Sequence, residues 1–102
     1  MTRPLTVAEH SAYLRTKAAL ELVRDERRRQ DGLVTAGKFR WTCAELGVDE
    51  GYKLAVLGEE YGEVCRVLCE AITARQAPDV EHLREELVQV AAVAVAWLEA
   101  LE

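Results

Sequence analysis

The chain has 102 residues, of which 50% are hydrophobic and 30% are charged, and this composition is typical of a single globular domain. The net charge of −5 argues against a protein that coats nucleic acid. No apolar run reaches the roughly 18 residues of a membrane span, and the first residues lack the apolar core of a secretory signal. The three cysteines form no paired framework. We therefore expect a soluble, cytoplasmic protein with no membrane and no nucleic-acid polymer as its partner.

Charge is distributed unevenly along the chain. Residues 1–40 contain nine lysines and arginines against five acids, whereas residues 41–102 contain four against thirteen. A basic segment can bind phosphates, and an acidic segment can hold divalent cations. Two solvated faces that differ in sign would give the same asymmetry, so charge alone does not choose between these readings.

Helix signals divide the chain into three segments. Thr6 and Glu9 form a capping box, which predicts a helix over about residues 6–30. Four of the six glycines fall between residues 31 and 51, and they predict a loop over residues 31–49.

Two further helices are predicted beyond this loop. A second helix is predicted over residues 50–76, because apolar residues recur three and four positions apart. Its apolar face comprises Leu54, Leu57, Tyr61, Val64, Leu68 and Ile72. Pro78 breaks this helix, and Asp79 is the expected N-cap of a third helix over residues 79–101. No segment alternates with a period of two, so we expect a single all-α domain over residues 1–102.

The third helix carries a signal for oligomerisation. Between Leu87 and Leu98 the only polar residue is Gln89, so apolar side chains point in every direction around the helix axis. A helix that is apolar all round must be buried all round. Two other helices cannot enclose it in so short a chain. We therefore expect a homo-oligomer, either a dimer or a dimer of dimers.

Acidic residues interrupt an apolar seam of the second helix. Val56, Glu60, Glu63 and Val67 follow the spacing of a core-facing stripe, and its two middle positions are carboxylates. Glu59 flanks them on the more polar side.

The third helix has a matching pair, because Glu86 and Gln89 lie one turn apart on one face. A short Pro-Asp turn between the two helices would bring both polar pairs face to face. Carboxylates crowded in an apolar environment need a compensating cation. Mg²⁺ is the expected ion and Mn²⁺ a plausible substitute. The alternative is that these acids are solvent-facing charges.

The residues Glu59-Glu60-Tyr61-Gly62-Glu63, followed by Glu86-Leu87-Val88-Gln89, resemble the EExxE…ExxD signature of the MazG-like nucleoside triphosphate pyrophosphohydrolases, which belong to the all-α NTP pyrophosphatase superfamily. This resemblance covers about residues 24–101. It implies an antiparallel helical bundle that is completed by homo-oligomerisation. It also implies hydrolysis of a nucleoside triphosphate to the monophosphate and pyrophosphate, in nucleotide-pool housekeeping.

The resemblance also assigns metal ligands. It implies that Glu60, Glu63 and Glu86 bind Mg²⁺, with Glu59 as a further ligand or as the base that activates water. Gln89 stands where the family usually has aspartate. A glutamine oxygen can still coordinate Mg²⁺, but one negative charge is lost, which brings a second metal ion and turnover into question.

The basic first segment gains a role in this reading. Arg28, Lys38 and Lys53 are the expected phosphate contacts, from a wider set that includes Arg27, Arg29 and Arg40. Trp41 can stack on a base. The alternatives are a solvated helix end for residues 27–29 and a packing role for Trp41.

Three functions therefore remain open from the sequence. The first is a Mg²⁺-dependent nucleotide pyrophosphohydrolase. The second is a non-catalytic relative that binds metal or nucleotide without turnover, which Gln89 favours. The third is a helical interaction protein whose acids are only solvated.

Overall fold

The structure is a computed structural model that describes residues 3–102, and it contains three helices. Helix α1 spans Val7–Thr35, α2 spans Glu50–Ala74 and α3 spans Val80–Ala100. No β-strand occurs among residues 3–102, which confirms the all-α prediction. Within the described part of the chain, none of the helices combines the length and apolar character needed to cross a membrane.

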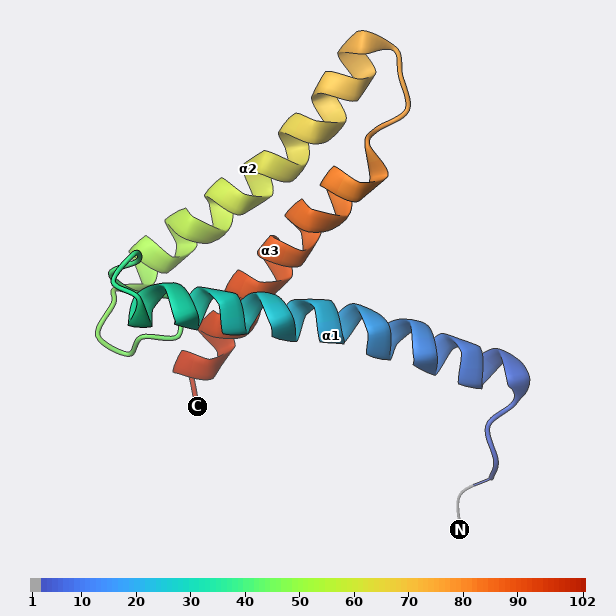
Figure 1. Cartoon of the computed structure of the whole chain (residues 1–102), viewed down its shortest axis with the longest axis horizontal. Coiled ribbons are helices and arrows are strands. Elements are labelled where there is room, and N and C mark those ends of the chain that lie inside the picture. Colours follow the sequence, from blue (N-terminus) through green and yellow to red (C-terminus); the bar gives the residue numbers. More distant parts are fainter. Residues whose placement is uncertain (1–2) are drawn as a thin grey trace.

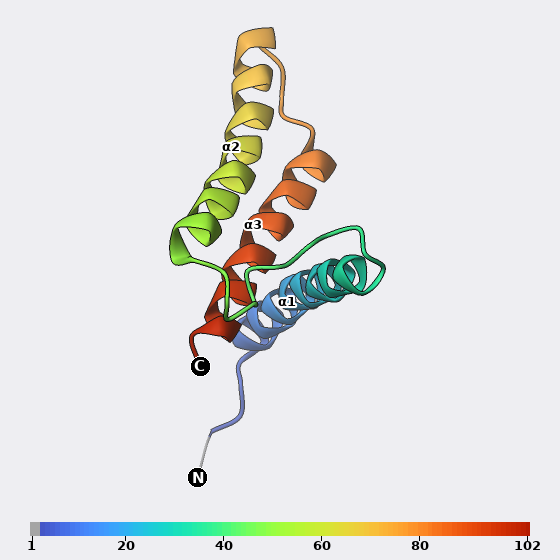
Figure 2. The same ribbon diagram turned by 90° about the vertical axis from the view of Figure 1, so that its left-hand side faces the viewer.

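Helix α3 is the centre of the fold, because α1 and α2 both pack against it. Helices α2 and α3 run antiparallel as a hairpin, and α1 crosses α3 at a large angle (Figure 1). The N-terminal half of α1 extends away from the other two helices. Figure 2 shows α1 almost end-on, with the hairpin of α2 and α3 rising beside it. The C-terminal part of α1 is therefore the part that meets the hairpin.

Side chains cap the helix starts as the sequence predicts. The Thr6 hydroxyl accepts a hydrogen bond from the Glu9 amide at 3.1 Å, and the Glu9 carboxylate accepts one from the Thr6 amide at 3.2 Å. Asp79 accepts from the His82 amide at 3.2 Å, which confirms it as the N-cap of α3. Asp49 caps α2 in the same way. Each cap satisfies a backbone donor that the first helical turn leaves open.

The predicted end of the first helix, near residue 30, is wrong. Helix α1 continues through Gly32 to Thr35, and the Thr35 hydroxyl donates to the Asp31 carbonyl at 3.2 Å. The helix ends before Gly37, whose φ of +76° is a left-handed conformation that glycine adopts without a steric penalty. The irregular connection therefore covers residues 36–49 and is shorter than predicted.

The core of the single chain is small. A buried cluster of Cys43, Val93 and Ala96 joins the connection to α3, and Trp41 and Val56 pack against it. Val64, Val67 and Ala92 are the other buried apolar residues. The buried side of α2 is thus centred on Val64 and Val67.

The apolar face predicted for α2 is only partly buried, so that prediction is wrong for this chain alone. Leu54, Tyr61 and Ile72 are 60%, 62% and 75% exposed. In α3, Leu87 and Leu98 are 50% and 64% exposed. Helix α1 crosses α3 rather than covering α2, so no other segment of residues 3–102 covers one side of the hairpin.

The chain is also less compact than its length predicts. Its radius of gyration is 16.8 Å, whereas a compact domain of this length has a value of about 13 Å. Its accessible surface is 7831 Å², whereas a folded monomer of this mass exposes about 5,800 Å². The difference is of the size that a dimer interface buries.

Candidate active site

A cavity of about 430 Å³ lies where the three helices and the connection between α1 and α2 meet. This volume falls within the range of pockets that bind small molecules. Aromatic and apolar side chains of the connection form one part of the wall, and charged or amide side chains of the helices form another. The lining residues are Glu26, Arg29, Gln30, Phe39, Trp41, Thr42, Cys43, Val56, Glu59, Glu60, Gln89 and Val93.

Helices α2 and α3 each present one face to this cavity. Val56 and Glu60 are one turn apart on α2, and Gln89 and Val93 are one turn apart on α3, so each pair shares a side of its helix. The predicted convergence of Glu60 and Gln89 is present. Val56 and Val93 place apolar surface beside these polar residues.

Glu60 is half-buried, and its Oε2 atom has neither exposed surface nor a hydrogen-bond partner. Burial raises the pKa of the Glu60 carboxyl above its ordinary value, because water no longer stabilises the charge. The charge of Glu86 on α3 raises this pKa further, followed by those of Glu59, Glu63 and Glu26. Glu60 is therefore a carboxylate in a place that disfavours its negative charge.

Glu86 presents the same feature from the opposite helix. Its side chain is only 13% exposed, and its Oε2 atom is also buried without a hydrogen-bond partner. The other oxygen, Oε1, lies 3.2 Å from Nε2 of His82, one turn earlier on α3. Two facing helices thus each hold one carboxylate oxygen that no donor among residues 3–102 satisfies. Buried acceptors left in this state are rare in folded proteins and call for an explanation.

The other two predicted metal ligands among the carboxylates, Glu59 and Glu63, are not buried in the way that Glu60 and Glu86 are. Glu59 is exposed and lines the cavity, and Glu63 forms a close ion pair with Arg66 on its own helix. Among residues 3–102, no three acidic, histidine or cysteine side chains come close enough together to hold a metal ion by themselves. The structure thus places Glu60 near enough to Glu86 for their charges to interact, but Glu86 does not line the cavity, and Glu63 is turned to Arg66.

The chemistry of the two buried oxygens fits a hard divalent cation. Mg²⁺ is usually bound through one or two carboxylates, with waters and substrate phosphates completing its coordination. Glu60 and Glu86 can supply two such ligands, and a cation between them would offset the repulsion that raises the pKa of Glu60. The Gln89 amide oxygen and the Glu59 carboxylate on the cavity wall are further oxygen donors.

Helix α1 adds a charged face that sequence reasoning did not single out as a unit. Glu26, Arg29 and Gln30 are spaced three and four positions apart and all line the cavity. The Glu26 carboxylate accepts from Arg29 Nε at 2.8 Å and from Arg29 Nη2 at 2.7 Å. Arg29 nevertheless keeps 54% of its side chain exposed, so it can reach a ligand in the cavity.

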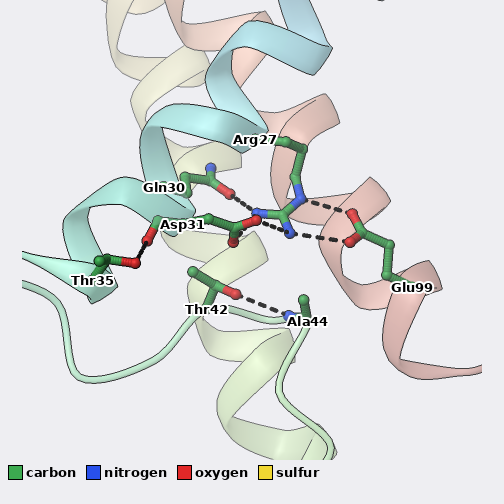
Figure 3. A network of polar contacts seen from close by, with 7 residues as sticks. All are labelled: Arg27, Gln30, Asp31, Thr35, Thr42, Ala44 and Glu99. Carbon is green, nitrogen blue, oxygen red and sulfur yellow. Dashed lines mark hydrogen bonds and ion pairs between the residues drawn. The ribbon is translucent and has the colours of Figure 1, made fainter.

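The neighbouring Arg27 has a structural role. It is only 7% exposed, and its guanidinium pairs with Glu99 of α3 at 2.8 Å and with Asp31 at 3.1 Å (Figure 3). These contacts raise the pKa of Arg27 and lower that of Glu99. Arg27 thereby fixes α1 on α3 and sets the position of the α1 face that lines the cavity.

The predicted substrate-binding residues are only partly brought to this cavity. Trp41 lines it and also packs against the small core, which confirms the packing role, while stacking on a base stays a prediction. Arg28 and Lys38 are exposed and do not line the cavity. Lys53 is only 1% exposed, and its ammonium lies 3.9 Å from the Glu50 carboxylate rather than on the cavity wall.

Sequence reasoning did not identify the α1 face formed by Glu26, Arg29 and Gln30. Their i, i+3, i+4 spacing is the signal that could have indicated it. The spacing shows that these side chains share one side of α1. It does not show that this side faces the cavity, because that depends on how α1 lies on α3.

Comparisons of the chain with protein-family models, with curated proteins and with solved structures find no match. The resemblance to the MazG-like enzymes therefore rests on the motif residues alone.

Proposed function

We propose that the chain is a Mg²⁺-dependent nucleoside triphosphate pyrophosphohydrolase of the MazG-like type, acting in cytoplasmic nucleotide-pool housekeeping. One observation carries this proposal: Glu60 and Glu86 each hold a buried oxygen without a hydrogen-bond donor, on facing helices, and Glu60 lines a cavity of ligand size. A divalent cation would satisfy both oxygens and offset their charge.

The other residues of the cavity have the chemistry that a nucleotide needs. Arg29 offers a guanidinium for phosphate oxygens, at the expense of its pairing with Glu26. Phe39 and Trp41 offer aromatic faces for a base. Mg²⁺, when bound, supplies neutralisation of charge on the phosphate oxygens.

Glu59 is the candidate general base, because it is an exposed carboxylate on the cavity wall. In the proposed reaction, Glu59 accepts a proton from water, and the water oxygen bonds to the α-phosphorus. The bond from that phosphorus to the bridging oxygen breaks, and pyrophosphate leaves with the electron pair. Arg29 would hold the leaving group in position.

The test is pyrophosphate release from a panel of nucleoside triphosphates, with and without Mg²⁺. We expect release by the wild type with Mg²⁺ and at least a hundredfold loss in Glu60→Gln, since oxyanion and metal contacts each contribute about that much. Glu70→Gln is the matched control, because Glu70 is an exposed glutamate of the same helix. Equal rates in all three proteins, or no release from any substrate, would contradict the proposal.

A second candidate function is binding of metal or nucleotide without turnover. Gln89 on the cavity wall favours it, as does the lack of three clustered metal-binding side chains among residues 3–102. A Gln89→Asp variant separates the two functions. A rise from no measurable turnover to measurable turnover in that variant would support the non-catalytic reading of the natural chain.

We further propose that a second copy of the chain completes an antiparallel helical bundle, as a dimer or a dimer of dimers. The excess surface, the large radius of gyration and the exposed apolar side chains of α2 support this proposal. A further apolar groove of about 430 Å³ runs between α1 and α3, lined in part by Leu22, Leu83 and Leu87. Apolar patches of this extent usually mark interfaces.

A further inference from the structure

The orientation of the Gln30 amide is fixed by its neighbours. Gln30 is only 8% exposed and lines the cavity, and its Oε1 accepts from Arg27 Nη1 at 3.0 Å. A guanidinium only donates hydrogen bonds, so the oxygen of the amide must face Arg27. Figure 3 shows the Gln30 nitrogen on the side away from Arg27. Arg27 is itself held by Glu99 and Asp31, which prevents the amide from turning over.

Thr42 offers a second donor on the same cavity. Its hydroxyl oxygen accepts from the Ala44 amide at 3.2 Å, as Figure 3 shows. A hydroxyl that already accepts a hydrogen bond keeps its own proton for donation. Phe39 and Trp41, from the same connection, line the cavity beside it. The part of the wall made by Gln30 and the connection, beside the paired Glu26 and Arg29, therefore combines aromatic faces with N–H and O–H donors.

We propose that this wall selects nucleotides whose base presents a keto oxygen, and that Gln30 is the residue that determines this specificity. The inference rests on the proposed function and names the substrate class for the same cavity. A keto oxygen accepts a hydrogen bond from the Gln30 N–H. An exocyclic amino group in the same place would point its own N–H at the Gln30 N–H, and neither donor would have an acceptor. A buried donor left unpaired costs enough to disfavour the amino-bearing base by about tenfold to a hundredfold.

Two pairs of nucleotides test this selection, because each pair differs at the keto or amino position. UTP is compared with CTP, and ITP with ATP, by calorimetric affinity and by kcat/KM for pyrophosphate release with Mg²⁺. We expect UTP and ITP to be favoured by about tenfold or more. Equal affinities within about twofold, with Mg²⁺-dependent release intact, would overturn the inference and leave the proposed function standing. No binding and no release with any of the four would overturn both.

A substitution of Gln30 gives the sharper result. Gln30→Glu keeps the shape and the contact with Arg27 but presents an acceptor in place of the N–H donor. We expect the preference to reverse toward CTP and ATP. Gln76→Glu is the matched control, because Gln76 is exposed beyond the end of α2, and it should keep the wild-type preference. An unchanged preference in Gln30→Glu would overturn the assignment of Gln30.

A second variant keeps the test decisive if Gln30→Glu does not fold. Thr42→Val is nearly isosteric and removes the other donor of the wall. We expect it to reduce the ratio of UTP to CTP affinity by about fivefold or more. A ratio equal to that of the wild type would contradict the proposed donor wall.

Discussion

Replacement of Glu60 by glutamine should stabilise the protein when no divalent ion is present. In the wild type, one oxygen of this carboxylate is buried without a donor, and an unsatisfied buried group of this kind costs about 1–3 kcal/mol. An amide keeps the shape and loses the charge, although its own polar atoms remain poorly paired. We therefore expect Glu60→Gln to raise the free energy of unfolding by about 1 kcal/mol at pH 7, or the Tm by roughly 4–8 °C.

The pH dependence of this difference tests its cause. The pKa of Glu60 is raised in the folded state, so the folded protein binds this proton more tightly than the unfolded chain does. The contribution of Glu60 to the stability of the wild type should therefore fall as pH rises from the ordinary glutamate pKa, about 4.3, through the folded-state pKa. Glu60→Gln lacks this loss, so the two proteins should converge in stability below about pH 4.

Urea denaturation across pH 3–8, with a chelator and at fixed protein concentration, measures the effect. Glu70→Gln, which changes an exposed carboxylate, should stay within about 0.5 kcal/mol of the wild type at every pH. A Glu60→Gln protein that is less stable than the wild type at pH 7 would refute the reasoning. A difference that does not depend on pH would refute it as well.

Four further predictions follow from other parts of the fold. Arg27→Ala should lower the free energy of unfolding by about 2 kcal/mol in urea denaturation, because it removes a buried side chain whose ion pairs and packing join α1 to α3; a loss below about 0.5 kcal/mol would contradict this. The Glu9 carboxyl should titrate by NMR with a pKa of about 2, because the Arg3 side chain and the Thr6 cap lower this pKa. The contribution of Glu9 to the cap is present at neutral pH and is lost as pH falls through that value. A midpoint above 4 would be inconsistent with the cap. Gln89→Asp should tighten Mg²⁺ binding about tenfold by calorimetry, because it restores a negative ligand, and unchanged affinity would show that residue 89 is not a ligand. Leu54→Glu should shift the mass measured by light scattering toward that of a single chain, while Glu70→Lys should not; an unchanged mass would place the interface elsewhere.

Local signals predicted the helices because each signal acts within a few residues. The capping box at Thr6 and the cap at Asp79 are both present, since such caps depend only on neighbouring backbone donors. On α2, helical periodicity placed Val56, Glu60, Glu63 and Val67 on one side, which is at least half-buried, whereas the predicted apolar face is largely exposed.

The remaining features depend on contacts between distant segments. Arg27 and Glu99 are 72 positions apart, and no local pattern shows that this pair places Glu26, Arg29 and Gln30 on the cavity. Lys53 had the charge of a phosphate contact, yet the fold buries it beside Glu50. The loop that clustered glycines predict from residue 31 begins only at residue 36, because a single glycine such as Gly32 costs a helix only about 1 kcal/mol and does not end it.

The most direct test of the metal site is a calorimetric titration of Mg²⁺ into the apo protein. Three variants are measured in parallel: Glu60→Gln, Glu86→Gln and Glu70→Gln. The wild type and Glu70→Gln should bind the ion with the same affinity. Each of the other two variants should lose at least tenfold, because each removes one of the two buried carboxylates. Equal binding by all four proteins, or no binding by the wild type even with a nucleoside triphosphate present, would contradict a cation held between α2 and α3.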